Sequence, residues 1–145
     1  MKIIIEEPEG QEEDSIIIRC RELSDDMMKM IYGLKNRNQR IPAAGNGSIT
    51  MVAPEEVYYF ETVDNRVFLY TETEVYETKM KLYEIEEQYP ETDFFRASKS
   101  TILNLSRIKH LTPAFSGRFE AVLQNGEKLI ISRQYVGKLK EKLGV

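Results

Sequence analysis

The sequence predicts a mainly β (α+β) fold, in which antiparallel β sheets with short helices follow a small strand-strand-helix extension. From residue 48 onward, short runs rich in Val, Ile, Tyr, Phe and Thr alternate with turn-forming residues, as is typical of short strands. The pairs Asp64-Asn65, Ser116-Gly117 and Asn125-Gly126 each separate two such runs and indicate hairpin turns. Apolar residues recur at helical spacing in only three segments, near residues 24–37, 79–90 and 132–143.

Residues 1–45 are predicted to form the extension. Two β-branched runs, 2–7 and 15–21, flank an acidic segment that contains Pro and Gly, and they predict two strands joined by an exposed connection. In the helix that follows, Ser24 is a suitable N-cap, and the two aspartates after it favour the positive end of the helix dipole. The small, Gly-rich segment 41–48 predicts a linker to a second unit, residues 46–145.

The second unit is predicted to begin with four strands. They are followed by a short helix that Pro90 ends, and then by further hairpins. Ser132 is a candidate cap for a last helix, whose apolar residues lie on one face. The predicted strand runs are 48–53, 56–62, 66–71, 74–79, 109–115, 118–124 and 128–132.

Composition indicates a globular protein. Its 145 residues are 41% hydrophobic and 30% charged, which does not fit a disordered chain. No apolar run approaches the roughly 20 residues of a membrane helix, and the N-terminus does not resemble a signal peptide. Cys20 is the one cysteine and cannot form an internal disulfide, so we expect a cytoplasmic protein.

The sequence offers little for catalysis. One cysteine and one histidine, His110, cannot form a zinc site of the Cys/His type. The acidic clusters lack the spacing of a calcium-binding loop, and Ser106 to Lys109 fits S-x-x-K without its companion motifs. We therefore expect no enzyme activity, no catalytic residues, no bound metal, no cofactor and no small-molecule substrate.

Charge is distributed unevenly along the chain. The net charge is −4 overall, yet counting Lys and Arg against Asp and Glu gives −2 for residues 1–45, −8 for 46–92 and +6 for 93–145. Within the last segment, residues 94–111 read FFRASKSTILNLSRIKHL and contain four Lys or Arg residues and no acid. Such asymmetry favours a nucleic acid or another acidic partner, although charges can also mix on a folded surface.

The basic stretch also carries hydroxyl and amide donors. Arg96, Ser98, Lys99 and Arg107 offer donors to phosphate oxygens, and Arg and Lys can reach base edges in a major groove. A turn whose Ser and Asn side chains cap their own backbone explains the same composition equally well.

Four landmarks of the sequence resemble the LytTR (LytR/AlgR-type) DNA-binding domain. The stretch FFRASKSTILNLSRI (94–108) resembles the family signature, and VYYFETVDNRVFLYT (57–71) resembles its strand, turn and strand. KLYEIEEQYP (81–90) resembles the short helix before the signature, and LQNGEKLIISRQYVGKLKEKL (123–143) resembles the closing hairpin and helix. The resemblance covers roughly residues 46–145, and the landmarks follow the family's order.

The resemblance implies a mostly β fold that contacts successive major grooves of repeated half-sites with loops. Three loops correspond to Asp64–Arg66, to the Ser98-Lys99 turn and to Arg133, while Ser100 and Asn104 are expected to hold the signature turn together. Together with the basic residues nearby, this predicts the following DNA-binding residues: Asn65, Arg66, Arg96, Ser98, Lys99, Arg107, Lys109 and Arg133.

The sequence thus predicts a transcriptional regulator that binds double-stranded DNA, acts as a homodimer on it and resembles the short family members without a receiver domain. A membrane-embedded regulatory partner is implied by the same resemblance. The acidic segment 46–92 should face away from the DNA, which it would repel. Residues 1–45 would serve dimerisation or partner docking, or would simply pack on the β domain. The alternatives are an interaction module whose basic face docks an acidic partner, and an RNA-binding protein, which should display exposed aromatic residues among its basic ones.

Overall fold

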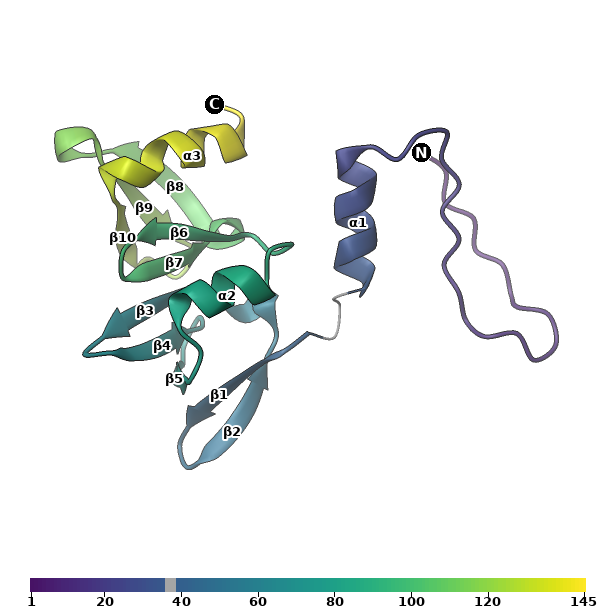
Figure 1. The fold of residues 1–145 in the computed structure, drawn as a ribbon, viewed down its shortest axis with the longest axis horizontal. Coiled ribbons are helices and arrows are strands. Elements are labelled where there is room, and N and C mark those ends of the chain that lie inside the picture. The colour runs from purple at the N-terminus through teal and green to yellow at the C-terminus, as the bar shows by residue number, and fades with distance from the viewer. Residues whose placement is uncertain (36–38) are drawn as a thin grey trace.

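The fold is mainly β, as the sequence predicts. The computed structural model describes residues 1–35 and 39–145, in which ten strands form two antiparallel sheets beside three α-helices (Figure 1). The first sheet has the strand order β2-β1-β5-β4-β3-β7-β6, and the second has the order β10-β9-β8. The helices are α1 (Asp25–Lys35), α2 (Leu82–Gln88) and α3 (Arg133–Leu143).

Seven of the ten strands follow the predicted runs closely, whereas no strand was predicted for β1, β6 or β7. In the first sheet they are β1 (Ile41–Gly45), β2 (Ser48–Val52), β3 (Tyr59–Val63), β4 (Arg66–Tyr70), β5 (Val75–Thr78), β6 (Phe94–Ser98) and β7 (Thr101–Asn104). The second sheet consists of β8 (Ile108–Pro113), β9 (Phe119–Leu123) and β10 (Lys128–Ile131). All three predicted hairpins are present, between β3 and β4, β8 and β9, and β9 and β10. Asp64 and Asn65 have φ values of 51° and 62°, the left-handed geometry that a two-residue hairpin turn requires.

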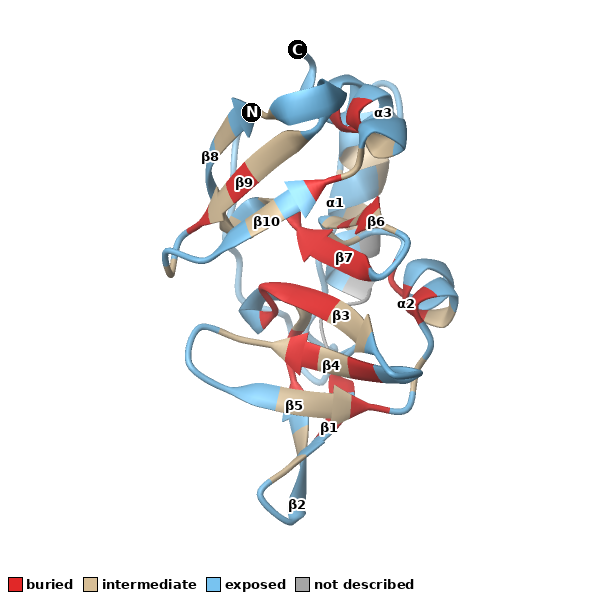
Figure 2. Cartoon of the chain, turned by 90° about the vertical axis from the view of Figure 1, so that its left-hand side faces the viewer, coloured by how far each residue is buried: buried red, intermediate tan, exposed pale blue. Residues whose placement is uncertain are grey.

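Two hydrophobic cores meet at strands β6 and β7. Along these strands the side chains alternate between them, because neighbouring residues of a strand point to opposite faces. Phe94 and Ile102 pack in the core under α2, while Phe95 and Leu103 pack in the core between the second sheet and α3. The buried residues therefore run through both layers, as Figure 2 shows. This shared pair of strands fixes the second sheet and α3 relative to the first sheet.

The two strands predicted in the N-terminal extension do not form. Residues 1–24 contain no strand, and Ile3 and Ile5 are 84% and 94% exposed. A two-stranded hairpin is at best marginally stable in water unless a third strand or a helix covers one face. The Ile runs of this extension have high β propensity, but no such layer lies over them in the described chain.

The predicted linker, residues 41–48, is likewise not a linker. It forms β1 and the Asn46-Gly47 turn into β2, so the first sheet begins ahead of residue 46. Ile41 and Ala43 are buried, and an added Cβ on Gly45 would lie 2.8 Å from the ring of Tyr76 in β5. Small residues here allow β1 to approach β5 closely.

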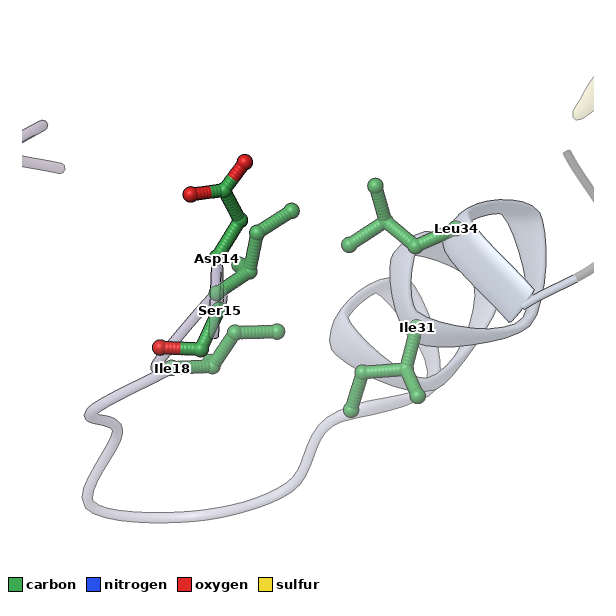
Figure 3. Close-up of a pocket in the computed structure, with 6 residues that line it drawn as sticks. Asp14, Ser15, Ile18, Ile31 and Leu34 are labelled. Atoms are coloured by element: carbon green, nitrogen blue, oxygen red, sulfur yellow. The ribbon is translucent and has the colours of Figure 1, made fainter. Parts of the chain in front are cut away.

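Helix α1 begins as predicted, because the Ser24 hydroxyl accepts a hydrogen bond from the Met27 backbone N–H at 3.2 Å. Its predicted continuation beyond residue 35 lies outside the described residues. Ile31 and Leu34 of α1 face the segment of Ile18 across an open cavity of about 470 Å³ (Figure 3). Over residues 1–35 and 39–145, no helix has the length and apolar composition needed to cross a membrane.

Candidate nucleic-acid interface

Two of the predicted loops lie side by side because the sheet joins them. The backbone N–H of Thr62, just before the β3–β4 turn, donates a hydrogen bond of 2.8 Å to the carbonyl of Ser100 in the β6–β7 turn. Within the second turn, the Ser98 hydroxyl accepts a hydrogen bond from the Ser100 N–H at 3.2 Å. The strand register shifts between Arg96 and Ser98, which lets the turn project from the sheet.

The third predicted loop adjoins the same turn from the other side. The N–H of Ser132, at the start of α3, donates a hydrogen bond of 2.8 Å to the carbonyl of Ala97. Arg133 follows directly and packs over Gly117, whose φ is +75° and where a Cβ would lie 3.1 Å from the side chain of Arg133. The Ser98–Ser100 turn therefore occupies the middle of a row of three loops.

A cleft of about 400 Å³ lies between the first two loops. Three predicted site residues line it, namely Asn65, Arg96 and Lys99, and Ser100 lines it too. Lys81, just before α2, also lines the cleft, and its ammonium donates a hydrogen bond of 3.4 Å to the carbonyl of Asn65. Lys81 was not among the predicted site residues, since Lys79 and Lys81 lie in an acidic segment and give no signal until the fold brings Lys81 to the cleft.

Three predicted site residues present free cationic side chains. Lys99, Lys109 and Arg133 are exposed, and none of them forms an ion pair within the described part of the chain. Ser98 is half-buried and oriented by Ser100. Lys99, Lys109 and Arg133 can therefore attract phosphate without first breaking an ion pair of the described chain.

Arg66 is exposed but already paired. Its guanidinium donates two hydrogen bonds to the Glu77 carboxylate, at 2.9 and 2.6 Å, and lies 5.6 Å from the centre of the Phe68 ring. The hydrogen bond from Arg66 lowers the pKa of Glu77, and the Glu77 carboxylate raises the pKa of Arg66. A two-pronged pair of this kind fixes the guanidinium at the start of β4, directly after the β3–β4 turn.

Arg96 and Arg107 are held inside the fold. Arg96 is paired with Glu86 of α2 at 2.8 Å, and its side chain is only 24% exposed. Arg107 donates through two nitrogens to the carbonyl of Glu55, and through the third to the Gln124 side chain at 3.2 Å. Its guanidinium also lies 5.2 Å from the centre of the Tyr58 ring. Both arginines thus have a clear structural role, and the DNA contact expected of them from the sequence would require these internal bonds to break.

The acidic segment does not face away from these residues as a whole. Glu77 and Glu86 both belong to it, and they are the partners of Arg66 and Arg96. Local pairing explains where these two carboxylates lie. The attraction of a carboxylate to a guanidinium at hydrogen-bonding distance is stronger than its repulsion by DNA phosphates farther away.

Asn104 anchors the strand after the signature turn. It is 3% exposed, and its amide donates to the Val57 carbonyl at 2.7 Å. Its side-chain oxygen accepts from the Ser106 N–H at 3.1 Å and from the Ser106 hydroxyl at 2.7 Å. Asn104 is therefore a structural residue, as expected, although it ties β7 to the entry of β3 rather than closing the turn itself.

The described residues offer no group of three His, Cys, Asp or Glu side chains that could hold a metal ion. His110, the single histidine, is exposed on β8. The concentration of cations around a row of loops instead suits a polyanion, which touches many donors along its length.

A sequence model of the LytTr DNA-binding domain matches residues 47–144. The chain belongs to the LytTR family. The family is one of DNA-binding domains and not an enzyme family, and the match spans α2, α3 and every strand of the two sheets except β1.

Relatives and a solved structure agree with this assignment. The sensory transduction protein LytT of Enterococcus faecalis is 34% identical over 109 residues, which is 75% of this chain and 45% of that protein. The chain thus spans less than half of the LytT proteins that it matches. The LytTr DNA-binding domain of a Bacillus cereus response regulator superposes with a TM-score of 0.70 at 25% identity, covering 73% of this chain and 97% of that domain.

One relative extends over the N-terminal extension too. A Staphylococcus aureus protein named an uncharacterized HTH-type transcriptional regulator is 25% identical over 138 residues, covering 94% of this chain and 93% of that protein. The alignment with that protein therefore includes most of the extension as well as the LytTR domain of this chain.

Proposed function

We propose that this protein is a transcriptional regulator that binds double-stranded DNA sequence-specifically through the three adjoining loops. The observation that carries the proposal is the pair of main-chain hydrogen bonds, Thr62 to Ser100 and Ser132 to Ala97, which line up the loops of a LytTR domain. A row of loops can follow a groove where a single loop would reach only one or two bases.

Within this row we assign different roles to the predicted residues. Lys99 and Arg133 are the candidates for base edges and nearby phosphates, because both are exposed and unpaired within the described residues. Asn65 and Lys81 supply further donors from the cleft, Ser98 adds one from the β6–β7 turn, and Lys109 adds charge from β8. Arg66 can join them by exchanging its bond to Glu77 for one to DNA.

The finer features follow the same proposal. We propose that the protein acts in the cytoplasm as a homodimer on repeated half-sites, with its activity set by a membrane-embedded partner. Support comes from the layout shared with the Staphylococcus aureus regulator, whose match includes the extension that could dock such a partner.

The test is fluorescence anisotropy with a duplex from the promoter of the protein's own operon and with a scrambled duplex, each at several salt concentrations. If about six phosphates are neutralised, the slope of log K against log salt should lie near −5. Preference for the promoter duplex should be lost in Arg133→Ala and kept in Lys142→Ala, which removes an exposed cation from the other end of α3. Equal, weak and salt-sensitive binding of both duplexes would refute sequence-specific recognition and favour an acidic protein partner.

A further inference from the structure

Strand β2 is an open edge of the first sheet. It pairs with β1 on one side, and no strand of the described chain lies on its other side. Residues 41–54, which include both strands, contain no Asp, Glu, Lys or Arg, although 30% of the chain is charged. Edge strands are usually protected by charged residues, Pro or bulges, because an open row of backbone groups invites another strand. The edge strand β2 has none of these.

The strand register identifies the free backbone groups. Gly45 and Ser48 flank the two-residue Asn46-Gly47 turn and therefore form a hydrogen-bonded pair. Since the pattern alternates, Ser48, Thr50 and Val52 bond to β1, and the N–H and C=O of Ile49 and Met51 point outward. Of these groups, the Met51 carbonyl accepts a long hydrogen bond of 3.4 Å from the exposed side chain of Arg40, which a better-placed donor can replace.

The side chains of the same two residues make the edge apolar. Ile49 is 73% exposed and Met51 is 49% exposed. They share the outer face of the hairpin with Pro42 and Ala44, which stand opposite them on β1 and are exposed as well. These four side chains form an uncharged patch that continues across both strands.

We propose that β2 pairs antiparallel with β2 of a second copy, around a two-fold axis at Thr50. In this register Ile49 lies opposite Met51 of the second copy, and Met51 lies opposite its Ile49. Each pair exchanges two backbone hydrogen bonds, so all of the outward groups of the strand are used. If the axis lay at Ile49 or at Met51 instead, the other of these two residues would lie opposite a residue outside β2 of the second copy, and its outward groups would find no strand partner. Neither strand carries a charged residue, and the exposed Arg40 side chain leaves the Met51 carbonyl when the second strand pairs there.

The expected dimer is weak on its own. Two five-residue strands and a small patch bury less than the roughly 1,200 Å² of a stable interface. Association should therefore depend on protein concentration and become strong when a ligand holds two copies close together. The proposal does not rest on DNA binding, and its test uses no DNA.

A disulfide across the axis tests the register. Two Thr50 residues would form a non-hydrogen-bonded pair with Cα atoms about 4.5 Å apart, which a disulfide can span. In the full chain carrying Cys20→Ser, Thr50→Cys should form a covalent dimer under mild oxidation about tenfold faster than Ser48→Cys. Ser48 is the matched control, since it lies on the same strand and face as Thr50. In the proposed register, however, the two residues at position 48 are offset by four residues along the strands, about 14 Å. Equal rates, or no dimer from Thr50→Cys, would overturn the proposal.

A second experiment distinguishes another occupant of the edge, the Ile-rich run 15–21 of the extension, which contains Cys20. In a chain that keeps Cys20, Thr50→Cys should still give a disulfide between two residues at position 50, identified by mass spectrometry of peptides. A disulfide between positions 20 and 50 would overturn the proposal in favour of the extension. Adding Ile49→Lys should abolish cross-linking, while Val75→Lys, which adds the same charge at an exposed residue of β5, should not. Circular dichroism checks that each variant is folded.

Discussion

Replacing Arg107 with Ala should destabilise the protein and leave the salt dependence of DNA binding unchanged. The substitution removes the donors that hold the Glu55 carbonyl, a hydrogen bond to Gln124 and a contact with the Tyr58 ring. Hydrogen bonds from charged groups contribute about 1.5–3 kcal/mol each, and the cation–π contact adds about 0.5–1 kcal/mol. Because Arg107 is half-buried and water replaces part of this, we expect a loss of about 2 kcal/mol.

Urea unfolding followed by circular dichroism measures this loss. With an m value of about 2 kcal/mol/M, the midpoint of the Arg107→Ala variant should fall by roughly 1 M. Lys99→Ala is the opposite case, because Lys99 is exposed and forms no ion pair within the described residues. Its free energy of unfolding should stay within about 0.5 kcal/mol of the original value, while the magnitude of the salt slope of DNA binding should decrease by about 0.9.

The two variants therefore separate a structural cation from a DNA-contacting one. Anisotropy titrations of the folded Arg107→Ala protein should give the original salt slope even where its affinity is reduced. An unchanged urea midpoint together with a slope smaller by about one would refute the structural role and make Arg107 a phosphate contact.

Three further predictions concern contacts that hold the fold together. Asn104→Ala should lower the free energy of unfolding by about 3 kcal/mol, since it leaves buried polar groups unpaired. Ser106→Ala should lower it by only about 1 kcal/mol. Equal losses for the two variants in urea unfolding would contradict the anchor role of Asn104. The folded-state pKa of Glu77 is lowered, so its pair with Arg66 stabilises the fold above the unfolded pKa, and this contribution is lost as pH falls through the folded pKa. In an NMR titration of the carboxyl group, Arg66→Ala should return this pKa toward its ordinary value, and an unchanged pKa would contradict the pairing. Gly45→Ala should cost about 1–3 kcal/mol by thermal unfolding, because its Cβ would meet an aromatic ring of β5 at 2.8 Å, and wild-type stability would show that the ring moves freely.

The parts of the fold that local chemistry determines were predictable from the sequence. Asp64, Asn65 and Gly126 adopt positive φ at low cost, and they place the hairpins where the pattern predicts them. Asn46-Gly47 makes the same kind of turn, yet β1 has too few β-branched residues to be recognised as a strand. Its burial against β5 is what selects the extended conformation, and that contact is not local.

The opposite error occurred in the extension. Ile3 to Ile5 and Ile16 to Ile18 have the highest β propensity in the chain, but most of these side chains remain exposed and unpaired in the described structure. Strand propensity mainly reflects packing on a pleated surface, so it has little effect where no surface is supplied.

The candidate site was predictable as a set of loops and not as a set of free charges. The resemblance located the three loops, and main-chain hydrogen bonds explain why they adjoin. Counting basic residues, however, could not distinguish Lys99 from Arg96, whose partner Glu86 lies ten positions earlier on another element. Lys81 was overlooked for the converse reason, because its acidic neighbours in sequence are not its neighbours in the cleft.

The internal pairing also explains how an acidic protein could recognise DNA selectively. Non-specific binding requires only free cations near phosphates, and at this surface Glu77 and Glu86 neutralise two of the arginines. If Arg66 contacts DNA, it must exchange two good hydrogen bonds to Glu77 for equivalent ones, which a correctly placed base edge or phosphate can supply and a misplaced one cannot. The carboxylates would then weaken binding to random sequence more than binding to the operator. On this argument the net charge of −4 does not oppose the proposed function, because it increases the difference between the two affinities.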